Sequence, residues 1–178
     1  MSDMIIKKLN IDEYQGRRFT VSYMTDGYYD IQRDDNGFRI EYKRFDKHVI
    51  KSFDDEFFGE WLEKPVGYGL FDNEKLVGYV EGSIEGWNKR FRISNICIFD
   101  ENLRHRGLGR MLLDTIMEDV KKSDVRMVVL ETQSCNERAI AFYRSYGFEI
   151  IGFDLYSYSN DDVKKHEIRI EMGMKIEK

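Results

Sequence analysis

Apolar and polar residues alternate along the first third of the chain in a pattern that predicts β-strands. The alternating apolar positions form two runs, at Phe19, Val21, Tyr23, Phe38, Ile40 and Tyr42. Residues 34–37, Asp-Asp-Asn-Gly, lie between the runs and predict a hairpin, because Asn-Gly readily adopts hairpin-turn angles. Residues 4–9 predict a short opening strand, and residues 52–62 predict a helix that ends before Pro65.

The middle of the chain predicts two antiparallel strands, at residues 68–71 and 76–84, around a polar turn. A further strand is expected at residues 92–99. A helix is expected after it, because mainly apolar residues recur there with the i, i+3, i+4, i+7, i+8 spacing of one helical face. These positions are Leu108, Met111, Leu112, Thr115 and Ile116.

The last third predicts a valine-rich buried strand at residues 126–132 and then a helix at residues 139–146. Asn136 suits the N-cap of this helix, and Gly147 suits its left-handed C-terminal position. Closing strands are expected at residues 148–151 and 168–174. This order of strands and helices predicts a mixed α/β (α+β) fold.

The length of 178 residues predicts one domain spanning residues 1–178. A formal net charge of −5 argues against nucleic-acid binding through bulk charge and favours a small cationic partner. No apolar run approaches the roughly 20 residues of a membrane span, and the N-terminal residues lack the apolar stretch of a signal peptide. We therefore expect a cytoplasmic protein with no membrane partner.

The residue types that bind metals are scattered along the chain. Cys97 and Cys135 lie far apart, and the three histidines stand at positions 48, 105 and 166. A structural zinc site needs about four clustered ligands, so no metal is expected. Each cysteine is expected to be a small buried residue or a free thiol rather than half of a disulfide.

A glycine-rich loop is the most informative local feature. Gly107 and Gly109 follow a predicted strand and precede a predicted helix, whose first N–H groups have no partner within the helix. A phosphate or pyrophosphate would satisfy these donors, and Arg104, Arg106 and Arg110 add positive charge. No Gly-Lys-Ser/Thr follows, which excludes a Walker A loop. An ordinary helix N-terminus with solvated arginines accounts for the loop alone equally well.

A second motif follows the buried strand, in the spacing Asn-x-x-Ala-x-x-x-Tyr-x-x-x-Gly-Phe. Its residues here are Asn136, Ala139, Tyr143, Gly147 and Phe148. Together with the Arg-x-x-Gly-x-Gly loop that begins at Arg104, this segment resembles the GNAT family of N-acetyltransferases. The resemblance covers residues 68–151, which it implies to be the acetyl-CoA-binding core. It leaves residues 1–65 as a variable region on the acceptor side.

The resemblance also implies a fold and a cofactor site. In that family a mixed sheet, flanked by helices, is splayed at its centre and acetyl-CoA enters the gap. The loop N–H groups would hold the pyrophosphate, and the backbone at two positions of the preceding strand would pair with the pantetheine amides. The residues implied to bind acetyl-CoA are Cys97, Ile98, Arg104, His105, Arg106, Gly107, Leu108, Gly109, Arg110, Asn136 and Tyr143. One departure is the segment 99–103, which is one residue longer than the commonest version.

The implied reaction needs a base for the amine and an acid for the CoA thiolate, because an alkylamine is nearly all ammonium at neutral pH. Tyr143 is the candidate acid, and a core tyrosine is its simpler interpretation. Glu81 and Glu85 share one face of a predicted strand and are the preferred base candidates, ahead of Glu131. Each of them could instead be an ordinary solvated carboxylate, and a water chain without a dedicated base is the remaining alternative.

The acceptor class stays open at this point. The segments at residues 130–133, 142–143, 147–148 and 152–156, with Asn136, resemble the streptothricin acetyltransferase branch, which acylates a cationic antibiotic. That branch tends to carry an acidic pair where this chain has Ser94-Asn95. A small cationic amine, such as a streptothricin-like antibiotic or a polyamine, is the preferred acceptor. A protein N-terminus or lysine is the alternative acceptor, and a non-catalytic acyl-CoA sensor is the alternative function. A homodimer is left open.

Overall fold

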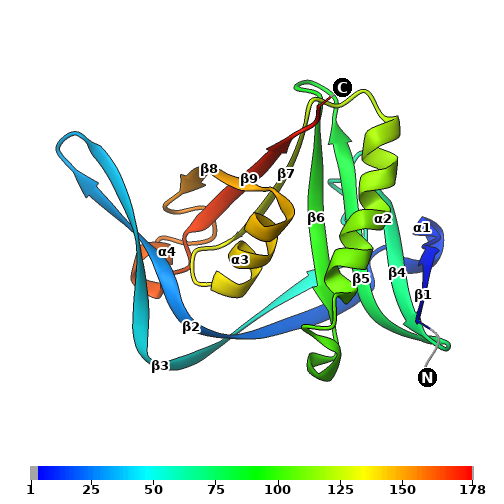
Figure 1. Cartoon of the computed structure of the whole chain (residues 1–178), viewed down its shortest axis with the longest axis horizontal. Coiled ribbons are helices and arrows are strands. Elements are labelled where there is room, and N and C mark those ends of the chain that lie inside the picture. Colours follow the sequence, from blue (N-terminus) through cyan, green and yellow to red (C-terminus); the bar gives the residue numbers. More distant parts are fainter. Residues whose placement is uncertain (1–3, 178) are drawn as a thin grey trace. The chain divides into compact units, whose positions relative to one another are not determined.

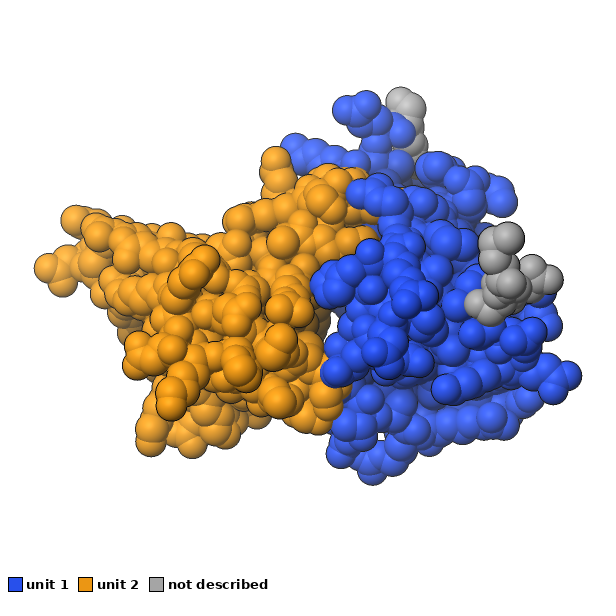
Figure 2. Space-filling view, turned by 60° about the horizontal axis from the view of Figure 1, so that its bottom comes forward, with its two compact units in different colours: residues 1–21, 54–129, 175–178 blue, residues 22–53, 130–174 orange. Residues whose placement is uncertain are grey.

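The computed structural model describes residues 4–177 and divides the chain into two compact units (Figure 2). Unit 1 contains residues up to 21, residues 54–129 and the chain from 175 onward. Unit 2 contains residues 22–53 and 130–174. The expected mixed architecture of strands and helices is confirmed, and the single domain expected for residues 1–178 stays a prediction.

Unit 1 is an antiparallel sheet with one long helix against it. Neighbouring strands run in the order β1, β4, β5, β6. Their bounds are Met4–Lys8 for β1, Val66–Asp72 for β4, Lys75–Glu85 for β5 and Arg90–Ile98 for β6. Helix α2 (Leu108–Lys122) lies along β4, β5 and β6 (Figure 1), and a short helix α1 (Ile11–Tyr14) follows β1. The predicted strands and the helix after the glycine-rich loop are confirmed.

The buried face of α2 differs slightly from the predicted one. Met111 was expected on that face, yet its side chain is 43% exposed. The buried side chains follow an i, i+4, i+5 pattern, so the buried face includes Leu113 and Met117 instead of Met111. The buried side chains are Leu108, Leu112, Leu113, Ile116, Met117 and Val120.

Unit 2 contains the C-terminal strands and the second helix. Strand β7 (Met127–Gln133) begins in unit 1 and ends in unit 2, where β9 (Arg169–Lys175) lies beside it and β8 (Glu149–Asp154) beside β9. Strands β8 and β9 are antiparallel. Helix α3 (Glu137–Tyr146) follows β7, and the short helix α4 (Asp162–Lys165) precedes β9. The predicted helix and its neighbouring strands are therefore confirmed.

Strands β2 (Arg18–Asp34) and β3 (Gly37–Glu56) form a separate two-stranded ribbon. The predicted turn at residues 34–37 connects them. The helix predicted at residues 52–62 is wrong, because β3 continues to Glu56 and a turn follows it. Cross-strand contacts hold this end extended: the Thr20 hydroxyl donates to Asp54 Oδ1 at 2.6 Å, and Phe57 N–H donates to the Arg17 carbonyl at 2.9 Å.

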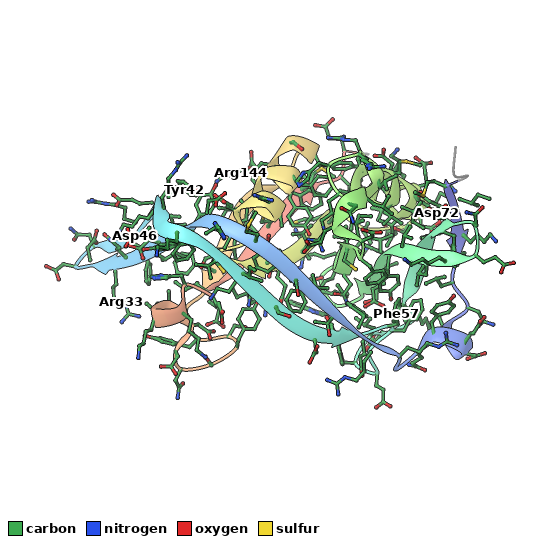
Figure 3. The ribbon with its side chains drawn as sticks, turned by 90° about the horizontal axis from the view of Figure 1, so that it is seen from below. Arg33, Tyr42, Asp46, Phe57, Asp72 and Arg144 are labelled. Atoms are coloured by element: carbon green, nitrogen blue, oxygen red, sulfur yellow. The ribbon has the colours of Figure 1, made fainter. Side chains whose placement is uncertain are left out.

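The apolar spacing that imitated a helix instead serves a cluster in unit 1. Phe57 and Phe58 follow the ribbon directly and are buried against Leu9 and Tyr79. Figure 3 shows Phe57 where the end of the ribbon meets this unit. Phe58 has a φ of 50°, so the chain turns sharply between β3 and β4 and does not form a helix there.

Candidate functional site

The glycine-rich loop leads into an α2 N-terminus that no side chain caps. Gly107 is the N-cap residue, with a φ of 80° that favours glycine, and nothing lies within 4 Å of the position a Cβ would take. His105 also has a positive φ, of 61°. Because no side chain accepts from the first N–H groups, the loop fits an anionic group such as a pyrophosphate.

The charged residues of the loop differ in their surroundings. Arg104 is half-buried; its Nε donates to the carbonyl of Ile98 at 3.1 Å, and its Nη1 lies 3.5 Å from Glu101 Oε1. Arg104 therefore ties the loop to the end of β6. His105, Arg106 and Arg110 are exposed.

The segment between β6 and the loop, noted above for its extra residue, contains a 3₁₀ turn. The turn spans Glu101–Leu103, and the Asp100 carboxylate accepts from Asn102 N–H at 2.9 Å to cap it. The longer segment thus folds locally, and β6 ends before it, at Ile98.

Cys97 and Ile98 are the last two residues of β6 and pair with β5. Cys97 lies opposite Tyr79, and Ile98 lies opposite Gly78. A Cβ at Gly78 would lie 2.7 Å from Ile98 Cδ1, so glycine permits this close approach. The Cys97 thiol is free, and its burial raises its pKa, so it stays a neutral thiol.

The pairing of β5 and β6 is irregular beside the candidate base. Glu81 pairs with Asn95 and the next residue, Gly82, pairs with Ile93, which leaves Ser94 as an extra residue on β6. The Ser94 hydroxyl is buried and has no hydrogen-bond partner among residues 4–177. The Ser94-Asn95 pair, which replaces an expected acidic pair, thus lies at this bulge.

Glu81 is completely buried and accepts three hydrogen bonds. Phe58 N–H donates to Oε2 at 2.8 Å, Asn95 Nδ2 donates to Oε1 at 2.9 Å, and the Tyr79 hydroxyl also donates to Oε2. Burial raises the pKa of Glu81, and the three hydrogen bonds oppose that rise without cancelling it. Sequence reasoning missed Tyr79, although its i, i+2 spacing from Glu81 on a strand places both on one face.

Glu85 has a different environment at the other end of β5. It accepts from Arg92 Nε at 2.6 Å and from Arg90 Nε at 2.9 Å, and Asn88 Nδ2 lies at 3.1 Å. Burial alone would raise the pKa of Glu85, but the hydrogen bonds from Arg92 and Asn88 and the nearby guanidinium charges lower it. The structure therefore separates the two base candidates chemically: Glu81 accepts from three neutral donors, whereas Glu85 forms two ion pairs.

In unit 2, helix α3 carries the residues of the second motif. Asn136 is the N-cap, and its Oδ1 accepts from Ala139 N–H at 3.4 Å. Gly147 ends the helix with a φ of 117°, as its pattern predicted. Tyr143 is buried, with 7% of its surface exposed, and its ring contacts those of Phe142 and Phe148.

Glu131, the lower-ranked base candidate, also lies in unit 2. Arg169 Nη2 lies 2.6 Å from its Oε2, and the Tyr158 hydroxyl donates to its Oε1 at 3.5 Å. Burial raises the pKa of Tyr158, so its hydroxyl keeps its proton at neutral pH. Sequence reasoning did not connect Tyr158 or Arg169 with Glu131, because 27 residues separate even the nearer of them from it.

The described residues contain neither a cluster of metal ligands nor a membrane-spanning helix. Between residues 4 and 177, no three His, Cys, Asp or Glu side chains gather as metal ligands would. None of the helices within the same range combines the length and the apolar content that a bilayer crossing requires.

Unit 1 thus contains a helix N-terminus that suits an anionic group, and unit 2 contains an Asn-capped helix with a buried tyrosine. The pattern of the acetyltransferase (GNAT) family matches residues 18–148. The chain belongs to this family and is an acetyltransferase that uses acetyl-CoA.

Two curated relatives show the range of acceptors among similar proteins. Streptothricin acetyltransferase of Escherichia coli is 26% identical over 133 residues, which cover 73% of this chain and 72% of that enzyme. The [ribosomal protein bS18]-alanine N-acetyltransferase of Escherichia coli K12 is 39% identical over 101 residues. This match covers 57% of this chain, and the chain spans only 66% of that enzyme's length.

Solved structures match the fold over almost the whole chain. A nourseothricin acetyltransferase has a TM-score of 0.78 at 23% identity, covering 97% of this chain and 98% of its own. A putative streptothricin acetyltransferase from Bacillus anthracis, in complex with acetyl coenzyme A, has a TM-score of 0.72 at 22% identity, with 99% of each chain covered. The likeness includes the mixed sheet with its flanking helices.

Proposed function

We propose that this acetyltransferase moves acetyl from acetyl-CoA to a primary amine of a small cationic molecule, of the streptothricin or polyamine type. The observation that carries the proposal is the α2 N-terminus at Gly107, which has no side-chain cap and suits a pyrophosphate. The similarity to streptothricin acetyltransferase and the net charge of −5 support a cationic acceptor.

The cofactor roles are assigned on the family's pattern. The N–H groups of the loop from Arg104 to Arg110 bind the pyrophosphate, with Gly107 and Gly109 leaving room for its oxygens. The backbone at Cys97 and Ile98 pairs with the pantetheine amides. Asn136 contacts the cofactor arm.

The chain's own side chains move two protons. The amine must be neutral to attack the thioester carbonyl; as the C–N bond forms and the C–S bond breaks, the nitrogen loses a proton and the sulfur gains one. Tyr143 donates to the departing sulfur. Glu81 receives the amine proton, through a water because it is fully buried. Glu81 is preferred over Glu85 because its pKa is raised, whereas the pKa of Glu85 is lowered by two guanidinium partners.

The test is a thiol-release assay with acetyl-CoA and a panel of streptothricin, spermidine, an aminoglycoside and short peptides. We expect one fast small-molecule acceptor. Tyr143→Phe should lower kcat by roughly 10²-fold or more, the size of a general-acid contribution, and leave acetyl-CoA affinity by calorimetry within about twofold. Glu81→Gln should lower kcat, whereas Glu85→Gln, the matched control, should not. Unchanged rates for Tyr143→Phe would remove it from the acid role.

A second acceptor class has its own support. The 39% identity to the bS18-alanine N-acetyltransferase favours a protein N-terminus that begins with alanine. A peptide with an N-terminal alanine, compared with the same peptide blocked at its α-amine, separates the two classes. If the free peptide is acetylated faster than every small amine, the protein-acceptor function replaces the one proposed above.

A further inference from the structure

The ribbon of unit 2 leaves an apolar stripe in solvent near its tip. Three alternate residues of β3 form the stripe: Phe38 is 50% exposed, Ile40 is 39% exposed and Tyr42 is 45% exposed. They share one face because side chains alternate along a strand. Figure 1 shows the turn between β2 and β3 extending beyond β8 and α4 of the same unit. Large side chains on a projecting ribbon favour an interaction surface.

The inner contacts of this ribbon occupy only part of the stripe. The Phe38 ring contacts Phe153 on β8, and the Tyr42 ring contacts Tyr29, whose hydroxyl accepts from Arg144 on α3 at 3.0 Å. In Figure 3, the labels Tyr42 and Arg144 mark this region. The Tyr42 hydroxyl also donates to Glu137 on α3, and the Arg33 guanidinium lies over the Phe38 ring. These contacts hold the ribbon in place, and the rest of each side chain in the stripe is exposed.

One edge of β3 is also unpaired. Strand β3 belongs to a sheet of two strands, so β2 fills one edge and no strand of the described chain fills the other. The outward backbone groups at residues 37–44 make no hydrogen bond outside the ribbon in the described chain. An unpaired edge invites another strand, and proteins usually prevent this with charged side chains, proline or a bulge.

The charges on this edge do not prevent pairing with an identical strand. Arg39 and Glu41 alternate in sign on the face opposite the stripe, 3.6 Å apart. We propose that the β3 strands of two copies pair antiparallel about Ile40, so that Ile40 meets Ile40 of the partner subunit. This register places Arg39 opposite the partner's Glu41, and Glu41 opposite the partner's Arg39. It also places Phe38 opposite the partner's Tyr42.

Neighbouring registers lose these pairs. Centring the two-fold axis on Arg39 or on Glu41 would place two like charges opposite each other, which destabilises a strand pair. Centring it on Tyr42 would place Ile40 opposite Arg44 and Phe38 opposite Asp46. Only the Ile40 register among these combines two opposite-charge pairs with two aromatic pairs.

The energetic reason for pairing is the unpaired edge and the exposed part of the stripe, which the ribbon's own contacts do not cover. An isolated two-stranded hairpin is marginally stable in water; this ribbon already packs on its own unit through Phe38 and Tyr42, and further strands with an apolar face add to its stability. Pairing two ribbons makes an antiparallel sheet of four strands. The contact uses only about seven residues per copy, so it lies at the low end of specific interfaces and the dimer should depend on concentration.

Sedimentation velocity of the full chain over roughly 1–200 µM is the first test. The 21.3 kDa chain should approach twice its mass as its concentration rises. Arg39→Glu should weaken the dimer at least tenfold, because it places like charges opposite each other twice. The double variant Arg39→Glu with Glu41→Arg should restore it, because the opposite-charge pairs return.

Cross-linking tests the register independently. Ile40→Cys should form a disulfide-linked dimer under mild oxidation, because directly opposite residues of antiparallel strands lie about 4.5–5.5 Å apart, within disulfide reach. Ile50→Cys, which is on the same strand and 71% exposed, has no partner in this register and should stay unlinked. A monomer at every concentration, or a dimer that Arg39→Glu leaves unchanged, would overturn the proposal.

Discussion

The hydrogen bonds of the buried Glu81 carboxyl group lead to a prediction that can be tested without knowing the acceptor. The Tyr79 hydroxyl donates to the Glu81 carboxyl group in a site with no exposure, and this acceptor is charged once Glu81 has ionised. A hydrogen bond to a charged group contributes about 1.5–3 kcal/mol, and one to a neutral group about 0.5–1.5 kcal/mol. Tyr79→Phe should therefore cost about 2 kcal/mol in the natural chain and about 1 kcal/mol in a Glu81→Gln background.

The assay is a double-mutant cycle by urea unfolding at pH 7.5. The phenylalanine keeps the ring contacts of Tyr79 with Phe57 and Phe58, so the cycle isolates the hydroxyl. The expected coupling energy is about 1 kcal/mol, which exceeds the roughly 0.3–0.5 kcal/mol scatter of independent sites. Tyr68→Phe is the control, because its hydroxyl donates to Asp119 at 2.5 Å and shares no partner with Glu81.

The contribution of Glu81 to the free energy of unfolding should depend on pH, and the sign of this dependence is fixed. Burial raises the pKa of Glu81 above its ordinary value of 4.5, so the folded chain retains a proton that the unfolded chain has lost. The contribution of Glu81 to stability is greatest below pH 4.5 and is lost as pH rises through the folded pKa. Glu81→Gln should remove this slope. Additive effects of the two substitutions, or an unchanged slope, would refute the hydrogen-bonded carboxylate.

Four further predictions concern stability and use urea unfolding followed by circular dichroism. Glu85→Gln should cost about 1–2 kcal/mol at neutral pH; because the pKa of Glu85 is lowered, this cost should vanish as pH falls through that pKa, and a pH-independent cost would contradict it. Asn136→Ala removes the α3 N-cap and should cost about 1 kcal/mol, whereas Asn136→Ser should not. Gly147→Ala should cost about 1–2 kcal/mol, because its φ is 117° and Met174 Sδ lies 3.2 Å from the new Cβ. Ser94→Ala should be neutral or slightly stabilising, since the hydroxyl has no partner among residues 4–177.

The parts of the fold that the sequence predicted well are those set by local chemistry. Asn136 and Gly147 define the ends of α3 through their own side chain and backbone freedom, and both ends are confirmed. The turn at residues 34–37 is confirmed for the same reason. The glycine-rich loop was located correctly because Gly107 and Gly109 follow an alternating strand pattern and stand where the helical apolar spacing begins.

The errors arise where distant residues decide the structure. Residues 52–62 have a helical apolar spacing, but contacts with Arg17 and Thr20, more than 30 residues earlier, extend the chain through Glu56. The helices α1 and α4 have four residues each, which is too short for a helical spacing of apolar residues to be recognised in the sequence. Glu81 and Glu85 looked equivalent on one strand face, and only Tyr79, Phe58 and Asn95 on one side and two arginines on the other distinguish them.

The exchange of an acidic pair for Ser94-Asn95 has a chemical consequence for the proposed reaction. A carboxylate only accepts hydrogen bonds, so the Asn95 group that faces Glu81 must be the amide nitrogen. The Asn95 oxygen is thereby the end of the amide directed away from Glu81. In the proposed reaction Asn95 would offer an acceptor a partial negative charge where an acidic pair would offer full charges. Full charges would favour the ammonium form of the amine, which cannot attack, whereas an amide oxygen orients a neutral amine by accepting from its N–H. In the proposed reaction the carboxyl group that takes the proton is instead on β5, at Glu81, whose pKa is raised by burial.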